Sequence, residues 1–218
     1  MNRPIYITEI KKIIMSSKGG SVFVASDFTD IASKKTASMG LLRLEEDGLI
    51  KRVLRGVYFK PEYNEFLAEY VAPNPDDVAN ALARNYGWTI VPCGDTALNM
   101  LGLSTQVPAV WSYVSDGPYK EYSYDNTIIK LNHTNNKDIS KCSYKTAIVI
   151  QALKAIGKEN IDDATLNKLS ETLTEKEKRL MLTESKAATS WIYEYIRMLC
   201  TARVETCTNN YTKTDCLL

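Results

Sequence analysis

Side chains that could bind an anionic polymer gather in two short segments near the start of the chain. Lysine and arginine donate hydrogen bonds to phosphate oxygens and base edges, and serine and threonine make shorter polar contacts of the same kind. In chain order the candidates are Lys34, Lys35, Thr36, Ser38, Arg43, Lys51, Arg52 and Arg55. The chemistry that they suggest is recognition of double-stranded DNA.

The first five candidates fall on one predicted helix, "SKKTASMGLLRLEED", which ends at Gly48. A period of 3.6 residues per turn places one stripe toward a core. That stripe consists of Ala37, Gly40, Leu41 and Leu44. Lys35, Ser38 and Arg43 then face outward, and Lys34 and Thr36 lie in the exposed first turn. Each cation at a helix N-terminus is unfavourable by about 0.3–1 kcal/mol, and a nearby phosphate would offset this. We predict that this helix contacts the major groove.

The other three candidates belong to "LIKRVLRGVYF", which alternates like a two-stranded hairpin turning near Leu54 to Gly56. In a strand of period two, Lys51 and Arg52 point to opposite sides, and Arg55 lies at the tip. A hairpin of this kind can reach the flanking backbone or the minor groove. We predict that it is the wing of a winged helix.

The elements before this helix complete the pattern. "ITEIKKIIM" predicts a helix with Ile7, Ile10, Ile13 and Ile14 on its apolar face. "VFVASDFTDIAS" predicts a short strand and a short helix, with Ser26 or Asp27 as the N-cap. Three short helices and a basic hairpin predict a winged helix-turn-helix domain over residues 1–62.

Residues 63–206 are predicted to form a second domain of helices around a small antiparallel sheet, so the expected fold class is α+β. A helix is expected from Asn74, a good N-cap, to Gly87, and another ends at Gly102. Short β-rich runs in residues 110–134, separated by "SDGP" and "YDN", predict an antiparallel meander. Helical patterns follow, the last of them opened by the capping box Thr174 and Glu177. The polar tail, residues 207–218, is expected to fray.

Other residue patterns favour structure over catalysis. "SSKGGS" lacks the spacing of a phosphate-binding loop. His133 is the only histidine, so it cannot build an ordinary metal cluster or catalytic triad. The carboxylate pairs Asp76–Asp77 and Asp162–Asp163 fall at helix starts, where capping explains them. We expect no enzyme activity, no metal and no cofactor.

The composition sets the general class. The chain has 218 residues, of which 44% are hydrophobic and 24% charged, as in ordinary globular proteins. Residues 1–60 carry 11 Lys and Arg against 6 Asp and Glu, a net charge of +5, which leaves −4 for the remainder. The start of the chain has no apolar signal core, there is no long apolar run, and the five cysteines form no C-x-x-C pair. We therefore expect a cytoplasmic protein that does not contact membranes.

Two motifs carry a resemblance to a known family. "LLRLEEDGLIKRVLRGVYF" resembles the end of the winged helix in AbiEi-like antitoxins of type IV toxin–antitoxin systems, which share the run R-L-x-x-x-G-x-I-x-R-V-x-R-G-x-Y. The matching residues are Arg43, Leu44, Gly48, Ile50, Arg52, Val53, Arg55, Gly56 and Tyr58. "CGDTALNMLGLSTQVP" is similar to the G-x-x-A-x-x-x-L-G-L-[ST]-T-Q-V-P signature of the same regulators. It matches at Gly94, Ala97, Leu101, Gly102, Leu103, Thr105, Gln106, Val107 and Pro108.

The resemblance covers about residues 5–140 and leaves the helical end without a counterpart. It implies a bacterial protein that binds operator DNA, represses its own operon and antagonises a nucleotidyltransferase-like toxin, without necessarily forming a stable complex with it. A homodimer on DNA stays open, because winged helices bind inverted repeats as dimers or as paired monomers.

Three alternatives remain. The protein could be a stand-alone winged-helix regulator without a toxin partner. It could instead be a protein-interaction module, as the outward-facing Met39 and Leu42 would suggest. An enzyme acting on nucleotides in the C-terminal region is the third, and the missing loop motifs argue against it.

Overall fold

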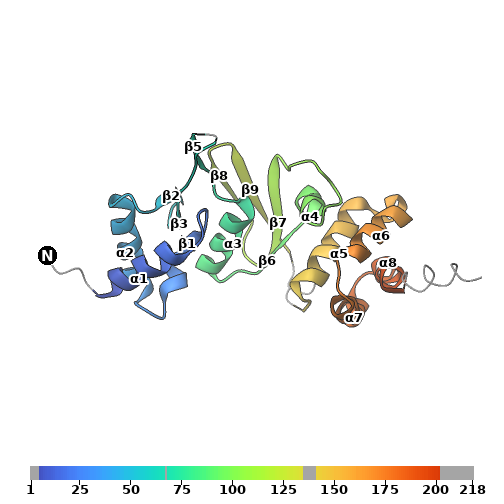
Figure 1. Cartoon of the computed structure of the whole chain (residues 1–218). Helices are drawn as coiled ribbons and strands as arrows, with labels where there is room; N and C mark the ends of the chain where they lie inside the picture. Colours follow the sequence, from blue (N-terminus) through green and yellow to red (C-terminus); the bar gives the residue numbers. More distant parts are fainter. Residues whose placement is uncertain (1–4, 67, 135–140, 202–218) are drawn as a thin grey trace, which may run out of the picture. The chain divides into compact units, whose positions relative to one another are not determined.

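The computed structural model describes residues 5–66, 68–134 and 141–201 (Figure 1). Helices and small sheets alternate along the chain, so the predicted α+β class is confirmed. The chain divides into two compact units. One comprises Met1–Ile90 and Ala109–His133, and the other comprises Val91–Pro108 and Thr134–Leu218. The predicted tail, residues 207–218, lies outside the described residues.

The first unit holds three sheets, with strand orders β1-β3-β2, β4-β5 and β6-β7-β9-β8. Strand β6 begins in this unit and runs into the other. The elements are α1 (Ile5–Ser16), β1 (Val22–Val24), the 3-10 turn η1 (Ala25–Phe28), α2 (Lys34–Glu46), β2 (Lys51–Leu54), β3 (Val57–Phe59), β4 (Glu62–Asn64), β5 (Glu69–Val71), α3 (Pro75–Tyr86), β6 (Ile90–Pro92), β7 (Val110–Ser115), β8 (Lys120–Tyr124) and β9 (Thr127–His133).

Strands β1 and β3 are buried on both faces. They pair antiparallel, with Phe23 opposite Tyr58 and Val24 opposite Val57. Because side chains alternate along a strand, Phe23 and Tyr58 pack among the helices α1 and α2. Val24, Val57 and their neighbour Phe59 pack into a second core with α3 and the four-stranded sheet. One small sheet thus lies between two cores.

Because the β1-β3-β2 sheet contributes to both cores, residues on either side of the predicted domain boundary belong to one compact unit. The boundary predicted between residues 62 and 63 falls inside the first unit. The segment before it contributes β1 and β3 to the core that also contains Val78 and Leu82 of α3. The two compact units therefore divide the chain differently from the predicted domains.

Helices α1 and α2 follow their predicted faces, with one exception. The buried residues of α2 are those of the predicted stripe, and at Gly40 an added Cβ would lie 3.3 Å from the Ile10 side chain. The exception is Ile13, which is 43% exposed because six residues carry it away from the stripe that starts at Ile7. Neither Ser26 nor Asp27 is an N-cap. The 3-10 turn η1 begins at Ala25, directly after β1, so Val24 is its N-cap residue, and Asp27 accepts a hydrogen bond from the Val24 amide at 2.9 Å.

The four-stranded sheet is mixed, not an antiparallel meander. β8 and β9 form the expected antiparallel hairpin, but β7 pairs parallel with β9. The connection after β7 therefore crosses the end of β9, where His133 Nδ1 lies 2.8 Å from the Gly117 carbonyl. Gly117 permits this path because an added Cβ would lie only 2.5 Å from the Trp88 ring. The turn residues of "SDGP" predict that the chain turns after β7, but they do not predict that it then crosses β9 before it forms β8.

In the described part of the second unit, the elements other than the end of β6 are helices. The most deeply buried of them is α5, in which every residue from Thr146 to Leu153 is buried. Helix α5 contacts α4, α7 and α8. The capping box of Thr174 and Glu177 is confirmed at the start of α7, but the final helical pattern is not continuous, because a 3-10 turn interrupts it. The elements are α4 (Gly94–Met100), α5 (Tyr144–Ile156), η3 (Lys158–Asn160), α6 (Asp163–Glu171), α7 (Glu175–Glu184), η4 (Ser185–Ala187) and α8 (Ser190–Thr201).

No helix within the described ranges is both long and apolar enough to cross a lipid bilayer.

Candidate nucleic-acid interface

The outward face of α2 carries three of the predicted DNA-binding residues. Lys35, Ser38 and Arg43 are exposed, on the side opposite the buried stripe. None of the three side chains has a hydrogen-bond or ion-pair partner among the described residues. Two cations and a hydroxyl on one helical face can donate to phosphates or base edges without breaking an existing contact.

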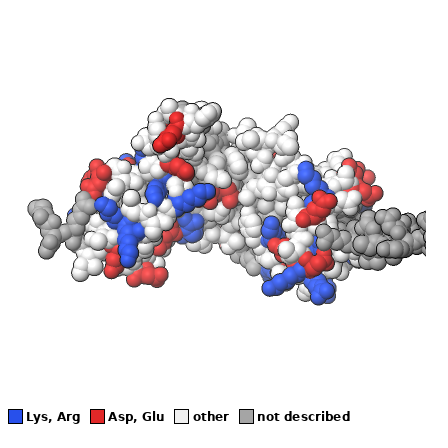
Figure 2. All heavy atoms as spheres, viewed as in Figure 1, with Lys and Arg blue, Asp and Glu red and all other residues white. Residues whose placement is uncertain are grey.

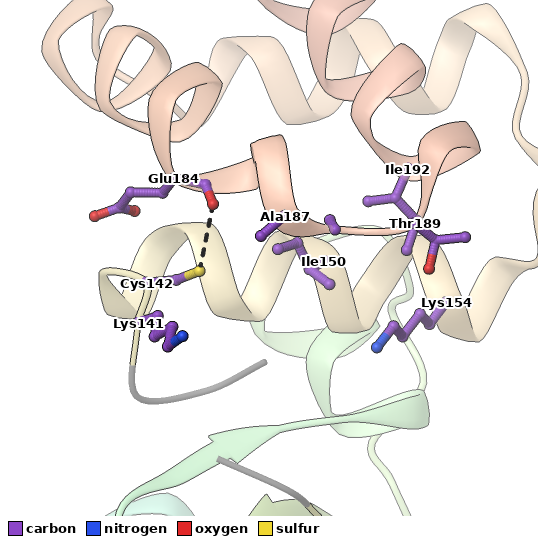
Figure 3. Close-up of a pocket in the computed structure, with 9 residues that line it drawn as sticks. Lys141, Cys142, Ile150, Lys154, Glu184, Ala187, Thr189 and Ile192 are labelled. Atoms are coloured by element: carbon purple, nitrogen blue, oxygen red, sulfur yellow. Dashed lines mark hydrogen bonds between the residues drawn. The ribbon is translucent and has the colours of Figure 1, made fainter. Parts of the chain in front are cut away.

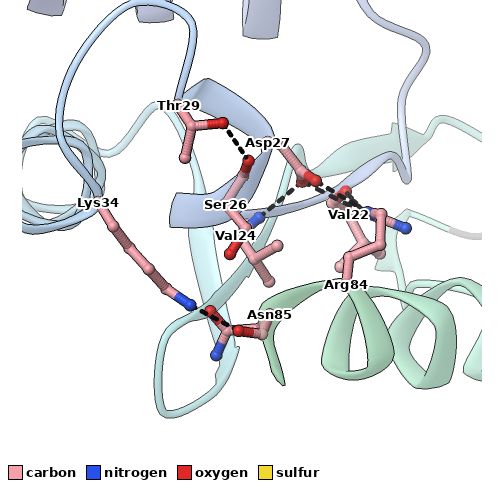
Figure 4. A network of polar contacts seen from close by, with 8 residues as sticks. All are labelled: Val22, Val24, Ser26, Asp27, Thr29, Lys34, Arg84 and Asn85. Carbon is pink, nitrogen blue, oxygen red and sulfur yellow. Dashed lines mark hydrogen bonds and ion pairs between the residues drawn. The ribbon is translucent and has the colours of Figure 1, made fainter. Parts of the chain in front are cut away.

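Two predicted residues in the first turn of α2 have structural partners. The Lys34 ammonium donates to the Asn85 carbonyl at the end of α3, at 2.5 Å (Figure 4). The Thr36 hydroxyl lies 2.9 Å from that of Ser33, whose oxygen also accepts the Thr36 amide as the N-cap of α2. Lys34 therefore fixes the start of the helix, and its charge lies against the negative end of the α3 dipole.

A second link joins α3 to the N-terminal elements beside Lys34 (Figure 4). The Arg84 guanidinium donates to both carboxylate oxygens of Asp27, at 2.8 and 3.2 Å, and to the Val22 carbonyl at 3.3 Å. A forked pair of this type constrains orientation as well as distance. Sequence reasoning missed Arg84 and Asn85, because no local pattern shows that the end of α3 meets the start of α2.

Of the three cations on the hairpin of β2 and β3, two contact other side chains and the third is exposed to solvent. The Lys51 ammonium lies 3.7 Å from the centre of the Tyr70 ring, a cation–π contact. Arg52 pairs with Glu45 of α2 at 3.3 Å. Arg55 lies at the turn, before Gly56 with its φ of 78°, and is exposed without a partner in the described part of the chain. Arg55 is therefore the hairpin cation most available to a ligand.

The Arg52–Glu45 pair also bears on a buried phenol. Arg52 lies opposite Tyr58 in the hairpin register. The pKa of Tyr58 is raised, first by burial and then by the Glu45 carboxylate, while Arg52 acts in the lowering direction. Both side chains of the pair are partly exposed, and such pairs stabilise a fold by only about 0–1 kcal/mol. Arg52 can therefore exchange Glu45 for a phosphate at small cost.

The surface over these elements mixes both signs of charge. On the face shown in Figure 2, Lys and Arg side chains lie over the N-terminal helices and hairpin, with Asp and Glu side chains interspersed. A surface of mixed charge produces no broad positive field that would attract a polyanion from a distance. Binding of a polyanion would instead depend on individual cations at defined positions.

The second unit contains a small cavity that could be an alternative site (Figure 3). Its volume is about 40 Å³, room for a few water molecules. Its side chains include Lys141, Cys142, Lys154 and Glu184. The Glu184 carboxylate already accepts hydrogen bonds from the Ser143 amide and hydroxyl, at 2.9 and 2.7 Å. Glu184 thus holds the start of α5, and we assign this cavity a structural role.

Within the described ranges, no group of three or more His, Cys, Asp or Glu side chains is placed to hold a metal ion.

Glu184 provides a pH-dependent test of the second unit. Burial raises the pKa of its carboxyl, but the hydrogen bonds from Thr146 and Ser143 outweigh that effect and the net pKa is lowered. A lowered folded-state pKa contributes stability above the ordinary value and loses it as the pH falls through the folded value. Glu184→Gln should lower the free energy of unfolding by about 1–2 kcal/mol at pH 7, and by progressively less below pH 4.5, in urea denaturation.

Glu194→Gln is the matched control, because Glu194 is exposed on α8 and has no partner in the described part of the chain. It should unfold like the wild type at every pH. Identical midpoints for Glu184→Gln and Glu194→Gln at pH 7 would contradict the assigned role.

The comparisons with known proteins give a family. No curated protein matches the sequence. A family model described as a family of unknown function (DUF6088) matches residues 9–181. This stretch begins within α1 and ends within α7. It covers most of the chain and contains both sequence motifs, residues 43–58 and 94–108. The protein therefore belongs to the family of unknown function DUF6088.

Proposed function

We propose that the protein is a DNA-binding transcriptional repressor whose N-terminal elements act as a winged helix-turn-helix. The observation that carries the proposal is the outward face of α2, where Lys35, Ser38 and Arg43 are exposed and unpartnered among the described residues. α2 would lie in the major groove and the β2–β3 hairpin beside it, with Arg55 toward the flanking backbone.

The packing of α2 supports this role. Its opposite face is fixed by Leu41 and Leu44 in the core with α1, and Lys34 ties its first turn to α3. A reading helix needs such support, because base contacts depend on side chains held at defined positions. The element order helix, strand, short helix, helix and hairpin is also the order predicted for a winged helix.

We propose further that the repressor is the antitoxin of a type IV pair and regulates its own operon in the bacterial cytoplasm. This part rests on the two sequence motifs that resemble AbiEi-like antitoxins. Its partners would be double-stranded operator DNA and a nucleotidyltransferase-like toxin, which it would counter without necessarily forming a stable complex with it.

The DNA assignment predicts the effect of three substitutions made together. Lys35→Ala, Arg43→Ala and Arg55→Ala should weaken binding to the DNA upstream of the gene at least 100-fold, because each base or phosphate contact by such a residue contributes about 1–3 kcal/mol. Fluorescence anisotropy on a labelled duplex measures the affinity. The control replaces Lys168, Arg179 and Lys186 by alanine, the same charge change on exposed residues of the second unit. Equal affinities for the two triple variants would refute the assignment.

The antitoxin assignment is tested by growth. Co-expression with the product of the adjacent gene, each from an independent promoter, should relieve toxicity whether or not the two proteins co-purify. The triple alanine variant at positions 35, 43 and 55 should still protect, because protection would not depend on operator binding. If neither form protects, the antitoxin role is wrong, while the DNA-binding role stands or falls on its own measurement.

A protein-interaction module is the second candidate, and specific exposed apolar side chains favour it. Met39 and Leu42 are 49% and 42% exposed on α2, and Phe66, in the turn after β4, is 95% exposed. Apolar contacts change little with salt, whereas phosphate contacts weaken steeply. A partner that binds α2 equally well at low and high salt would favour this candidate.

A further inference from the structure

An aromatic side chain at the end of the β4–β5 hairpin is almost completely exposed to solvent. Phe66 lies in the turn and has the largest exposed fraction, 95%, of any large hydrophobic side chain in the described part of the chain. Two carboxylates flank it, Glu65 in the same turn and Glu69 at the start of β5. Both are exposed and have no partner among the described residues. We call residues 65–69 the acidic turn.

The strands of this hairpin hold the acidic turn in place. Tyr63 lies opposite Tyr70, and their ring centres are 5.2 Å apart in an edge-to-face contact. The Lys51 ammonium of β2 lies 3.7 Å from the centre of the Tyr70 ring. Within the turn, the Phe66 amide donates to the side-chain oxygen of Asn64 at 3.0 Å. These contacts fix the hairpin to β2 and leave its turn in solvent.

The charge of this hairpin is opposite to the charge that a DNA contact requires. Residues 62–71 contain three glutamates and no lysine or arginine, and glutamates repel phosphates. Exposed apolar groups with a polar rim mark contacts with other proteins. The acidic turn therefore fits a protein surface on which cations flank apolar side chains.

The outward face of α2 has this complementary composition. Lys35, Met39, Leu42 and Arg43 lie at i, i+4, i+7 and i+8, which places them on one side of the helix, and all four are exposed. We call these four residues the α2 stripe. A cation lies at each end, about 12 Å apart at 1.5 Å of rise per residue, and two apolar side chains lie between. The next exposed residue on this side is the carboxylate Glu46.

We propose that the acidic turn of one copy of the chain binds the α2 stripe of a second copy. The Phe66 ring would pack against the apolar centre of the stripe, and the two carboxylates would pair with the cations at its ends. Within one copy both surfaces are exposed, so they do not cover each other and the contact needs two chains. A second copy is the partner whose complementary face lies on the same molecule.

This contact would regulate the proposed function. Lys35 and Arg43 of the α2 stripe are also the proposed DNA contacts, so a second copy bound there would exclude DNA. Self-association would thus lower operator occupancy as the protein accumulates. It would also cover Met39 and Leu42, which phosphates do not. The regulatory step rests on the proposed function, whereas the self-association does not.

Sedimentation equilibrium of the full chain without DNA, in low-salt buffer and up to about 0.5 mM protein, covers the range of weak interfaces. The weight-average mass of the wild type should rise with concentration. Glu65→Lys with Glu69→Lys should weaken the association at least 10-fold, and so should Phe66→Ser. The matched control is Glu159→Lys with Glu171→Lys, the same charge change on exposed residues of the second unit, and it should associate like the wild type. Thermal unfolding of each variant checks that it is folded.

A charge exchange identifies the second surface. Lys35→Glu with Arg43→Glu should weaken self-association at least 10-fold, because both surfaces then carry negative charge. When this variant is mixed with the Glu65→Lys and Glu69→Lys variant, the two should associate, because each then offers the charge that the other needs.

The proposal is overturned if the wild type stays monomeric at the highest concentration, a result that would leave the acidic turn to a different basic protein. It is also overturned if the variant with lysines at positions 65 and 69 associates like its control, or if the two charge-reversed variants stay apart when mixed. Self-association by a protein that does not bind its upstream DNA would keep the contact and refute the repressor role. DNA binding by a protein that stays monomeric would give the reverse outcome.

Discussion

Alternating side chains on β1 and β3 connect the two cores of the first unit, and the candidate interface depends on this connection. Phe23 and Tyr58 anchor the N-terminal helices from one face of the sheet, while Val24 and Val57 anchor α3 from the other. The strands have only three residues each and form few ladder hydrogen bonds. Burial of side chains on both faces is therefore what stabilises them. Because β3 is also the second strand of the hairpin, the buried pairs that fix β3 against β1 also fix the turn that carries Arg55. A basic hairpin on an independently mobile domain would lack this constraint.

The polar links around α2 add orientation to this packing. Lys34 and Arg84 each join α3 to the N-terminal elements, from opposite directions along the chain. Two of the predicted DNA-contacting residues thus have structural partners. Lys34 supports the start of α2, and Arg52 forms an ion pair with Glu45 that a phosphate would have to replace. In the proposed complex, DNA would contact Lys35, Arg43 and Arg55, which are exposed and have no ion-pair partner among the described residues. A net charge of +1 for the whole chain is compatible with this arrangement, since the contacts depend on position more than on total charge.

Local sequence patterns predicted the parts of the fold that depend on neighbouring residues. The stripe of Ala37, Gly40, Leu41 and Leu44 was predicted correctly, because helical periodicity places them on one side. The capping of α3 by Asn74, which accepts the Asp76 amide at 2.9 Å, followed for the same local reason.

Features that depend on distant residues were missed. The parallel pairing of β7 with β9 depends on the path over His133, and the contact of Lys34 with Asn85 joins residues 51 positions apart. The β4–β5 hairpin and its contact with Lys51 also escaped sequence reasoning, because residues 62–71 contain no glycine or proline that would predict a turn. The winged-helix interpretation and its DNA contacts stay predictions.

The most direct test is the salt dependence of binding to the protein's own upstream DNA, beside a scrambled duplex of the same composition. We predict tight binding that prefers the upstream sequence, with log K falling against log salt at a slope of about −3.6 for four phosphate contacts per chain. Weak binding that is equal on both duplexes, or affinity that does not change with salt, would contradict a DNA-reading role for α2 and its hairpin.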